Sequence, residues 1–446
     1  MERRIEKKII APAAILLDGR LAWGRAVYIE AGRIVATDTL ELLQASYPDA
    51  KVEHWRNLAL VPGTVNAHNH SFQSLLRGIA ADQPFLTWRD ESLYKYSPLM
   101  RPKDIYTGAL FAFAEMMKCG VTTVCDFFYL HNDGIAGDEA VIRAAKDIGI
   151  RLVLARTMYD WDGAPKGYVE DVKTAAANTE MLMQKYKGGM AKVIPAPHSL
   201  HAATPEMVQA GHELAEKYNT PMHIHVSEER FEVEQVKKEF GTTPLRLLHK
   251  LGVVDKRLNI IHGVWLEHEE IELMGEAKAQ LIYCPSSNMF LADGITDIPA
   301  YMKNQVPVAL GSDGACGNNR ISVFEEARMV AILQKAITLD ALCVKYDDAW
   351  KMATTGGARA LNLPVGDIVP GKYADFVGIK LDDFSMQPLS SNQQFLPNLV
   401  YSLQPTAIDR VMVNGQDTVV EGKLMGVSES EVLARVHATM EYLEEQ

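Results

Sequence analysis

Short apolar runs alternate with amphipathic stretches through the middle of the chain, from about residue 62 to residue 365. The apolar runs of strand length are 60–67, which leads into His68, and 120–125, 151–155, 191–195, 222–226, 258–262, 280–284 and 306–310. Stretches with helical spacing separate many of them, as at 103–117, 138–147, 204–218 and 322–334. This alternation predicts parallel strands, and that many repeats predict a (β/α)8 TIM barrel.

The two ends of the chain have a different pattern. Short alternating runs meet Asp-Gly and Ala-Gly turns in residues 1–61, and similar runs return in residues 366–446. Ser428 and Glu431 have the spacing of a capping box, which predicts a closing helix. We therefore predict an α/β protein in which a barrel, residues 62–365, stands beside a small β-sandwich domain built from both termini.

The composition is that of an ordinary globular protein and argues against several classes. Apolar residues make up 48% of the 446 residues, and the formal net charge of −12 argues against a nucleic-acid partner. The five cysteines include no Cys-x-x-Cys pair, which argues against a disulfide framework or a zinc finger. We find neither a signal peptide nor a membrane span, so we expect a cytoplasmic protein with a small-molecule substrate.

Histidines follow the predicted strands. His68 and His70 are one residue apart, so both imidazoles face the same side of an extended chain. Catalytic groups of a barrel gather at the carboxyl ends of its strands. The polar residues that end or directly follow the apolar runs are His68, His70, His198, His223, His225, His262 and Asp313. These nitrogen and oxygen donors suit a divalent metal, Zn²⁺ first, with Fe²⁺ or Mn²⁺ as alternatives. For His223 we expect a structural role.

These motifs together resemble the amidohydrolase superfamily, in its deaminase and chlorohydrolase branch. The matching segments are Pro62-Gly63 with Asn66–His70, His225–Glu228, Ile261–Gly263, Cys284–Asn288, Gly311–Asp313 and Gly366 with Gly371–Asp375. The resemblance implies the barrel and the composite β-sandwich, and one metal held by His68, His70, His225 and Asp313. Binuclear relatives have a carboxylated lysine at the end of the fourth strand, where this chain has His198.

The resemblance also implies roles for three residues in a hydrolysis that releases ammonia. Asp313 would bind the metal and take a proton from the attacking water, and Glu228 would protonate the leaving nitrogen. His262 would orient the hydroxide and stabilise the tetrahedral intermediate. Glu229 has the same side chain as Glu228, but the spacing from His225 favours Glu228.

For the substrate, the pocket motifs most resemble formimidoylglutamate deiminase, which hydrolyses a formimino group. By this resemblance Gln73, Arg89, Tyr129 and His198 would contact the substrate, with the Arg89 guanidinium on a carboxylate. His201 stands where that family has the arginine that binds glutamate, so a smaller or less acidic amidine is an alternative substrate.

The stretches 286–294 and 313–320 instead resemble hydrolases of amino-heterocycles: guanine, oxoguanine, pterin, adenosine-type and s-triazine compounds. In that case Trp88 would stack on a planar ring. We therefore predict a metal-dependent hydrolase of non-peptide C–N bonds, first for a formimino compound and alternatively for an amino-heterocycle. An inactive binding barrel is disfavoured by the intact set of polar residues. The family also implies a homo-oligomer such as a dimer.

Overall fold

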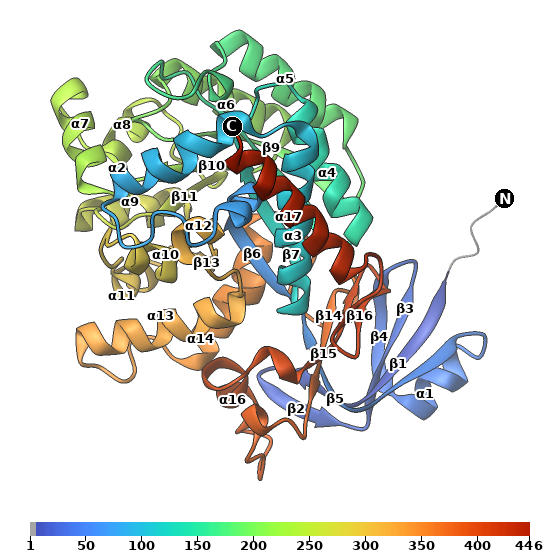
Figure 1. The fold of residues 1–446 in the computed structure, drawn as a ribbon. Helices are drawn as coiled ribbons and strands as arrows, with labels where there is room; N and C mark the ends of the chain where they lie inside the picture. The colour runs from blue at the N-terminus through green and yellow to red at the C-terminus, as the bar shows by residue number, and fades with distance from the viewer. Residues whose placement is uncertain (1–5) are drawn as a thin grey trace.

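The computed structural model describes residues 6–446 and has the predicted mixed α/β character (Figure 1). Within these residues, eight parallel strands form two four-stranded sheets, in the orders β6-β7-β8-β9 and β10-β11-β12-β13. Each predicted strand of the middle region overlaps one of them, so these predictions are confirmed. The strands are β6 (Thr64–Asn69), β7 (Val121–Phe128), β8 (Arg151–Met158), β9 (Ala191–Pro197), β10 (Met222–Val226), β11 (Leu258–His262), β12 (Gln280–Tyr283) and β13 (Val308–Leu310).

Hydrogen bonds connect the edges of these two sheets near the carboxyl ends of their strands. The His225 amide donates to the carbonyl oxygen of His198 at 2.9 Å, beside an isolated bridge between Ser199 and His225. At the other edge, the Asp313 amide donates to the carbonyl oxygen of His68 at 3.0 Å. Gly311 permits this close approach, because a Cβ there would lie 2.7 Å from the Cβ of His68.

Helices cover the outer faces of the parallel strands, which are therefore buried on both faces (Figure 1). The main ones are α3 (Pro102–Lys118), α4 (Ala136–Ile148), α5 (Val172–Lys185), α6 (Pro205–Tyr218), α7 (Arg230–Phe240), α8 (Pro244–Lys250), α9 (His268–Ala277), α10 (Pro285–Phe290), α11 (Ile298–Lys303) and α13 (Val323–Thr338). The four predicted helices correspond to α3, α4, α6 and α13.

Helix α6 illustrates how local sequence defines these elements. The Thr204 hydroxyl accepts a hydrogen bond from the Met207 amide, and Pro205 occupies the first turn. Asn219 ends the helix in the left-handed region, with φ of 48°. Two short helices near the pocket, α2 (Phe85–Trp88) and the π-helix η2 (Arg89–Tyr94), were not predicted.

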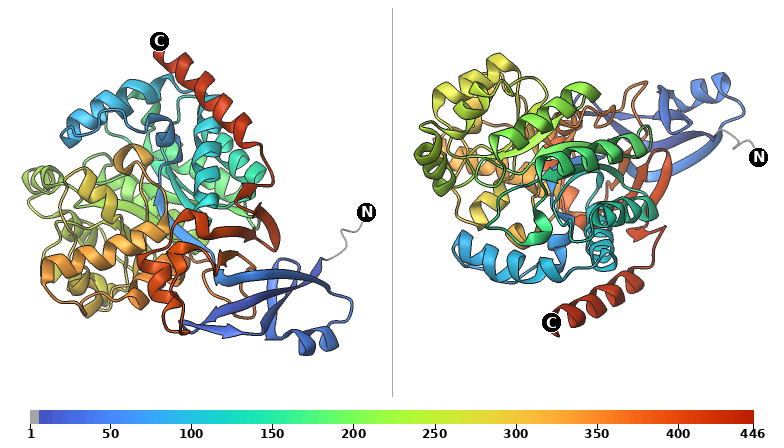
Figure 2. Two further views of the ribbon diagram at one scale, coloured as in Figure 1. Left: turned by 60° about the horizontal axis from the view of Figure 1, so that its bottom comes forward. Right: turned by 90° about the horizontal axis from the view of Figure 1, so that it is seen from above.

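Strands from both ends of the chain form one nine-stranded sheet beside the parallel strands (Figures 1 and 2). Strand β5 from the N-terminal part pairs with β14 from the C-terminal part, and Val61 lies opposite Val377. Residues 1–5 of the predicted N-terminal part lie outside the described residues, and the domain division at 61/62 and 365/366 stays a prediction. The strands are β1 (Lys7–Leu17), β2 (Arg20–Trp23), β3 (Arg25–Glu30), β4 (Arg33–Thr39), β5 (Lys51–Pro62), β14 (Phe376–Lys380), β15 (Ile408–Val413), β16 (Gln416–Val420) and β17 (Lys423–Leu424).

A buried ion pair links the parallel strands to the terminal sheet. Arg151, the first residue of β8, donates to both carboxylate oxygens of Asp375, at 2.8 and 3.0 Å. The C-terminal helix α17 (Glu429–Glu444) lies on the outside of the molecule beside α3, where Lys118 pairs with Glu429 at 2.7 Å (Figure 2). Ser428 caps this helix as predicted. Within residues 6–446, every helix is too short or too polar to cross a membrane.

Candidate functional site

The four predicted metal ligands meet at the carboxyl ends of β6, β10 and β13. Nε2 of His68 lies 3.3 Å from Nε2 of His225 and 3.4 Å from Oδ1 of Asp313. Nε2 of His70 lies 3.3 Å from the same Asp313 oxygen. All four side chains are buried, and the ligand atoms of the three histidines lie within 4.8 Å of one another. Residues more than 240 positions apart in sequence thus share one centre.

The hydrogen bonds of His70 and His225 orient their Nε2 lone pairs toward that centre. Nδ1 of His70 lies 2.6 Å from the carbonyl oxygen of Phe127, and Nδ1 of His225 lies 2.9 Å from that of His198. A carbonyl oxygen only accepts, so each Nδ1 holds the proton and each Nε2 presents a lone pair. Burial lowers the pKa of His70 to about 4 and that of His225 well below its ordinary value, so both are neutral.

Lone pairs and a carboxylate facing one another at 3.3 Å need a cation among them, and this donor set fits one divalent metal ion. Burial opposes the negative charge of Asp313, but contact with the imidazoles of His68, His70 and His262 holds the pKa of Asp313 below its ordinary value. The Ser287 hydroxyl donates to Oδ2 of Asp313 at 2.7 Å, and the Gly314 amide donates to Oδ1 at 2.7 Å. Asp313 therefore remains an oriented carboxylate.

Glu228 and His262 lie together beside the cluster. Oε1 of Glu228 is 3.3 Å from Nε2 of His262, which is in turn 3.9 Å from Oδ2 of Asp313. Burial, with the negative charges of Asp293 and Asp313, raises the pKa of Glu228 well above its ordinary value. Burial therefore favours the protonated form of Glu228, next to the carboxylate of Asp313.

The backbone is strained where these groups leave their strands. Asp313 has φ of 60°, His262 has φ of 72° and Ser227, next to Glu228, has φ of 53°. Non-glycine residues rarely adopt this left-handed region, and such strain clusters at active sites. These turns lie at the carboxyl ends of β10, β11 and β13, where Glu228, His262 and Asp313 come together.

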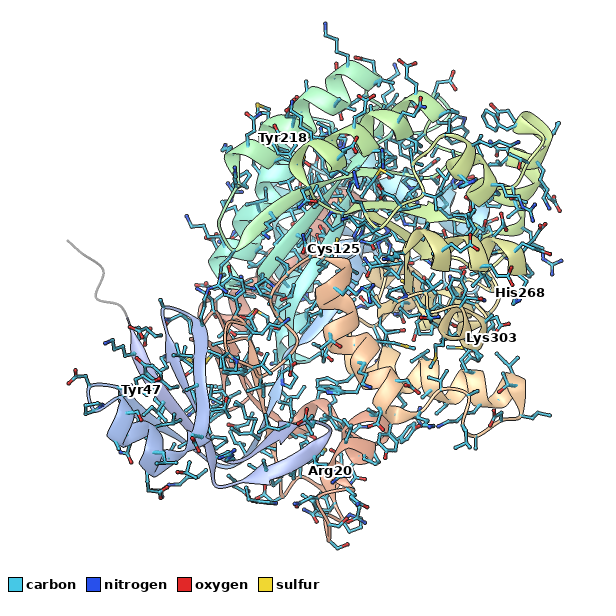
Figure 3. All side chains as sticks on the ribbon, turned by 180° about the vertical axis from the view of Figure 1, so that it is seen from behind. Arg20, Tyr47, Cys125, Tyr218, His268 and Lys303 are labelled. Atoms are coloured by element: carbon cyan, nitrogen blue, oxygen red, sulfur yellow. The ribbon has the colours of Figure 1, made fainter. Side chains whose placement is uncertain are left out.

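His223 is two residues before His225 in β10 and lies apart from this centre. Its Nε2 is 2.8 Å from the Asn259 amide nitrogen, and its Nδ1 is 3.6 Å from the Cys125 sulfur. Cys125 lies near the middle of the molecule in Figure 3, whereas His268 lies at its outer edge. His223 thus has the structural surroundings that we expected.

Three of the predicted substrate-contacting residues border the metal cluster. The Tyr129 ring lies 5.3 Å from His70 and 5.8 Å from His198, and its hydroxyl accepts a hydrogen bond from Gln73 at 3.0 Å. The His198 ring stacks on His225 at 4.9 Å. These residues are positioned to contact a molecule bound at the cluster.

The other three have different surroundings. Arg89 donates twice to Asp90, at 2.8 and 2.7 Å, and its guanidinium lies 4.4 Å from the Tyr94 ring centre. Trp88 is buried, and its indole N–H donates to the carbonyl oxygen of Cys316 at 3.1 Å. Burial and the charge of Arg89 lower the pKa of His201 to about 4, so His201 is neutral at pH 7.

Several residues that complete the site have no predicted role. Tyr159 lies 4.9 Å from His198, and Tyr168 lies 4.9 Å from Tyr129, so these tyrosines extend the pocket wall. They belong to the segment after β8, which has no motif. Ser287 and Asn288 are different: both lie in the segment Cys284–Asn288, whose resemblance was noted without assigning a task to either side chain.

Comparisons with known proteins agree with this geometry. The amidohydrolase family model matches residues 59–417. The 5-methylthioadenosine/S-adenosylhomocysteine deaminase of Pyrococcus furiosus is 34% identical over 374 residues, which cover 84% of this chain and 86% of that protein. The 5'-deoxyadenosine deaminase of Methanosphaera stadtmanae is 33% identical over 410 residues, covering 91% and 93%.

Among solved structures, an adenosine deaminase from Xanthomonas campestris with bound zinc superimposes with a TM-score of 0.90, at 26% identity and over 99% of both chains. The predicted enzyme class, a hydrolase of carbon–nitrogen bonds other than peptide bonds, agrees with these relatives. The formimidoylglutamate deiminase resemblance gains no support from them. The family match spans most of the sequence, and this chain therefore belongs to the amidohydrolase family.

Proposed function

We propose that this protein is a hydrolytic deaminase of adenosine-type nucleosides, the alternative that sequence analysis kept open beside a formimino substrate. The principal support is the buried Glu228–His262–Asp313 group beside the three histidines. Its support in sequence is the 33–34% identity, over most of the chain, to deaminases named for adenosine-type substrates.

His68, His70, His225 and Asp313 would hold one zinc ion, the metal bound in the Xanthomonas adenosine deaminase. A zinc ion so held would supply hydroxide at neutral pH, because it lowers the pKa of water to about 7. The neutral imidazoles support this proposal, since only an unprotonated nitrogen can bind a metal.

The remaining chemistry belongs to three side chains. The Asp313 carboxylate accepts a proton from the attacking water, and the Glu228 carboxyl donates its proton to the purine as the carbon–oxygen bond forms. Nε2–H of His262 donates a hydrogen bond to the attacking oxygen and orients it toward the purine carbon. Asp313 then passes the proton that it took from water to the amino group, the carbon–nitrogen bond breaks and ammonia leaves. The hydroxyl proton returns to Glu228 as the carbonyl group forms.

The surroundings of Arg89 and His201 favour an adenosine-type substrate over formimidoylglutamate. Arg89 is already paired with Asp90 and lies over Tyr94, so it is not a free partner for a carboxylate. His201 is neutral and lies 5.6 Å from the Phe231 ring. A substrate with two carboxylates would meet little compensating positive charge there, whereas the rings of Tyr129, Tyr159 and His198 suit a flat heterocycle.

We also propose that the two four-stranded sheets make one closed (β/α)8 barrel and that the terminal sheet folds as a β-sandwich. The hydrogen bonds from His225 to His198 and from Asp313 to His68 support closure at both edges. The catalytic groups would then lie at the carboxyl-terminal mouth of the barrel.

The test is an ammonia-release assay of the zinc-loaded protein. Adenosine, 5'-deoxyadenosine, 5'-methylthioadenosine and S-adenosylhomocysteine form one panel, and formimino-glutamate, guanine, a pterin and an aminotriazine form the other. We expect ammonia and the matching inosine-type product from at least one nucleoside, with kcat/KM of at least about 10⁴ M⁻¹ s⁻¹. Efficient turnover of formimino-glutamate with none of the nucleosides would reverse the substrate proposal.

A further inference from the structure

A buried amide contacts the side of His262 that faces away from the cluster. Nδ2 of Asn288 lies 3.0 Å from Nδ1 of His262 and 2.9 Å from Oδ2 of Asp293. The three side chains are at most 2% exposed. An asparagine amide nitrogen has two hydrogens, so both contacts can be made at once.

The direction of these hydrogen bonds determines which nitrogen of His262 is protonated. The amide nitrogen can only donate, so Nδ1 of His262 must accept and the ring proton must be on Nε2. In this orientation Nδ2 of Asn288 also donates to Oδ2 of Asp293, at 2.9 Å.

The backbone also holds this arrangement in place. The backbone N–H of Asn288 donates to the backbone carbonyl oxygen of Cys284 at 3.1 Å. The backbone N–H of Asp293 donates to the backbone carbonyl oxygen of Asn288 at 2.9 Å. Asn288 and Asp293 therefore belong to one fixed turn. Within residues 6–446, the Asn288 side-chain oxygen has no hydrogen-bond partner, so the orientation is determined by the two contacts of the nitrogen.

This arrangement is the reverse of that at the metal ligands. His70 and His225 donate through Nδ1 to carbonyl oxygens and present bare Nε2 atoms to the cluster. His262 accepts through Nδ1 and presents Nε2–H, 3.3 Å from Oε1 of Glu228. We propose that Asn288, held by Asp293, is a positioning residue that fixes the Nε2–H tautomer of His262, so that this imidazole acts as a hydrogen-bond donor and not as a metal ligand.

The inference rests on the proposed function for its catalytic consequence but not for the tautomer itself. An imidazole with a bare Nε2 could not donate a hydrogen bond to the attacking oxygen. A wrong tautomer in an otherwise intact site can reduce kcat by about 10⁴-fold, as when the partner of a catalytic histidine is changed from acceptor to donor.

The sharpest variant is Asn288→Asp, which has nearly the same shape but accepts where asparagine donates. We expect the ring proton of His262 to move to Nδ1, and kcat to fall about 10²- to 10⁴-fold with little change in KM. The tautomer is read directly from long-range ¹H–¹⁵N spectra of the zinc-loaded protein labelled with ¹⁵N-histidine, with the His262 signals assigned from a His262→Gln variant.

The matched control is Asp293→Asn, which retains an oxygen that accepts from Asn288. It should keep the Nε2–H tautomer and lower kcat by less than about 5-fold. Asn288→Ala removes the donor without adding a charge and should lower kcat about 10- to 100-fold, with both tautomers present. Bound zinc and the melting temperature are measured for every variant, so that a damaged fold is recognised.

Two results would overturn the inference: a wild-type His262 protonated on Nδ1, or an Asn288→Asp variant that keeps both the Nε2–H signal and the wild-type kcat. If Asn288→Asp does not fold, the wild-type spectrum and Asn288→Ala still decide. Absence of nucleoside deamination by the wild-type protein contradicts the proposed function alone, because the spectrum is recorded without substrate.

Discussion

The cluster of metal-ligand side chains and the aromatic wall of the pocket, formed by Tyr94, Tyr159 and Tyr168, are built in different ways. The cluster side chains are at the ends of strands or in the first residues after them, as His68 in β6 and His225 in β10 are. The wall is built by connecting segments: Tyr94 comes from η2, and Tyr159 and Tyr168 from the segment after β8. Strand ends fix positions through the sheet ladder, whereas loop side chains depend on contacts among themselves.

The two regions also differ in charge. Asp313 and Glu228 lie together on one side of the cluster, where burial and neighbouring carboxylates raise the pKa of Glu228. The aromatic wall consists of tyrosines and neutral histidines, and the Tyr159 ring lies edge-on to the His198 ring. Under the proposed function, one side of the pocket would transfer protons and the other would recognise the ring of the substrate. Changes to the first should affect kcat, and changes to the second should affect KM.

The largest effect is expected from Asp313→Asn. The amide removes a charged metal ligand and the proton acceptor together, so kcat should fall at least about 10⁴-fold, since loss of the base alone costs about 10²- to 10⁴-fold. Bound zinc should fall as well. Elemental analysis with the ammonia assay checks this, and Asp297→Asn, at the start of α11, is a matched control of the same chemistry outside the site. Full zinc content with wild-type turnover would contradict the assignment of Asp313.

The second effect concerns Glu228 and pH. Its pKa is raised by burial, and the reaction needs its protonated form, so activity should be present below that pKa and decline as the pH rises through it. Glu228→Gln cannot transfer a proton, so kcat should fall about 10²- to 10⁴-fold and the alkaline decline that belongs to Glu228 should disappear. The measurement is kcat/KM from pH 5 to 10. An unchanged alkaline limb in the variant would assign that limb to another group.

The cluster could be predicted from sequence because its side chains lie at strand ends, where strand geometry fixes their direction. A His-x-His at a strand end faces one side because side chains alternate along a strand, so spacing alone places His68 and His70 together. The wall has no such rule, because Tyr159 meets His198 only after two loops have folded against each other. The Asn288–His262 contact joins the ends of neighbouring strands, so its motif was visible but the hydrogen-bond direction was not.

The third effect tests the wall. Tyr159→Leu removes a flat ring beside His198, and KM for the best nucleoside should rise about 10-fold, since an aromatic contact is worth about 0.5–1.5 kcal/mol beyond its buried area. Bound zinc should not change and kcat should change less than KM. Tyr159→Phe keeps the ring and is the matched control, for which we expect a nearly normal KM. A large loss of kcat in the leucine variant would place Tyr159 with the proton-transfer side instead.

The smallest effect is expected from Arg89→Ala, and it distinguishes the two substrate hypotheses. Arg89 is partly exposed and paired with its neighbour Asp90, and such pairs contribute about 0.2–1 kcal/mol. Nucleosides with an uncharged 5' end should therefore lose less than about 5-fold in kcat/KM. A substrate whose carboxylate bound Arg89 would lose the whole charged contact, about 10²-fold or more. Steady-state kinetics with 5'-methylthioadenosine and formimino-glutamate measure both, with Asp90→Ala as the variant that frees the guanidinium. A loss of that size with 5'-methylthioadenosine would mean that Arg89 binds the nucleoside itself, and that the wall recognises charge as well as flat rings.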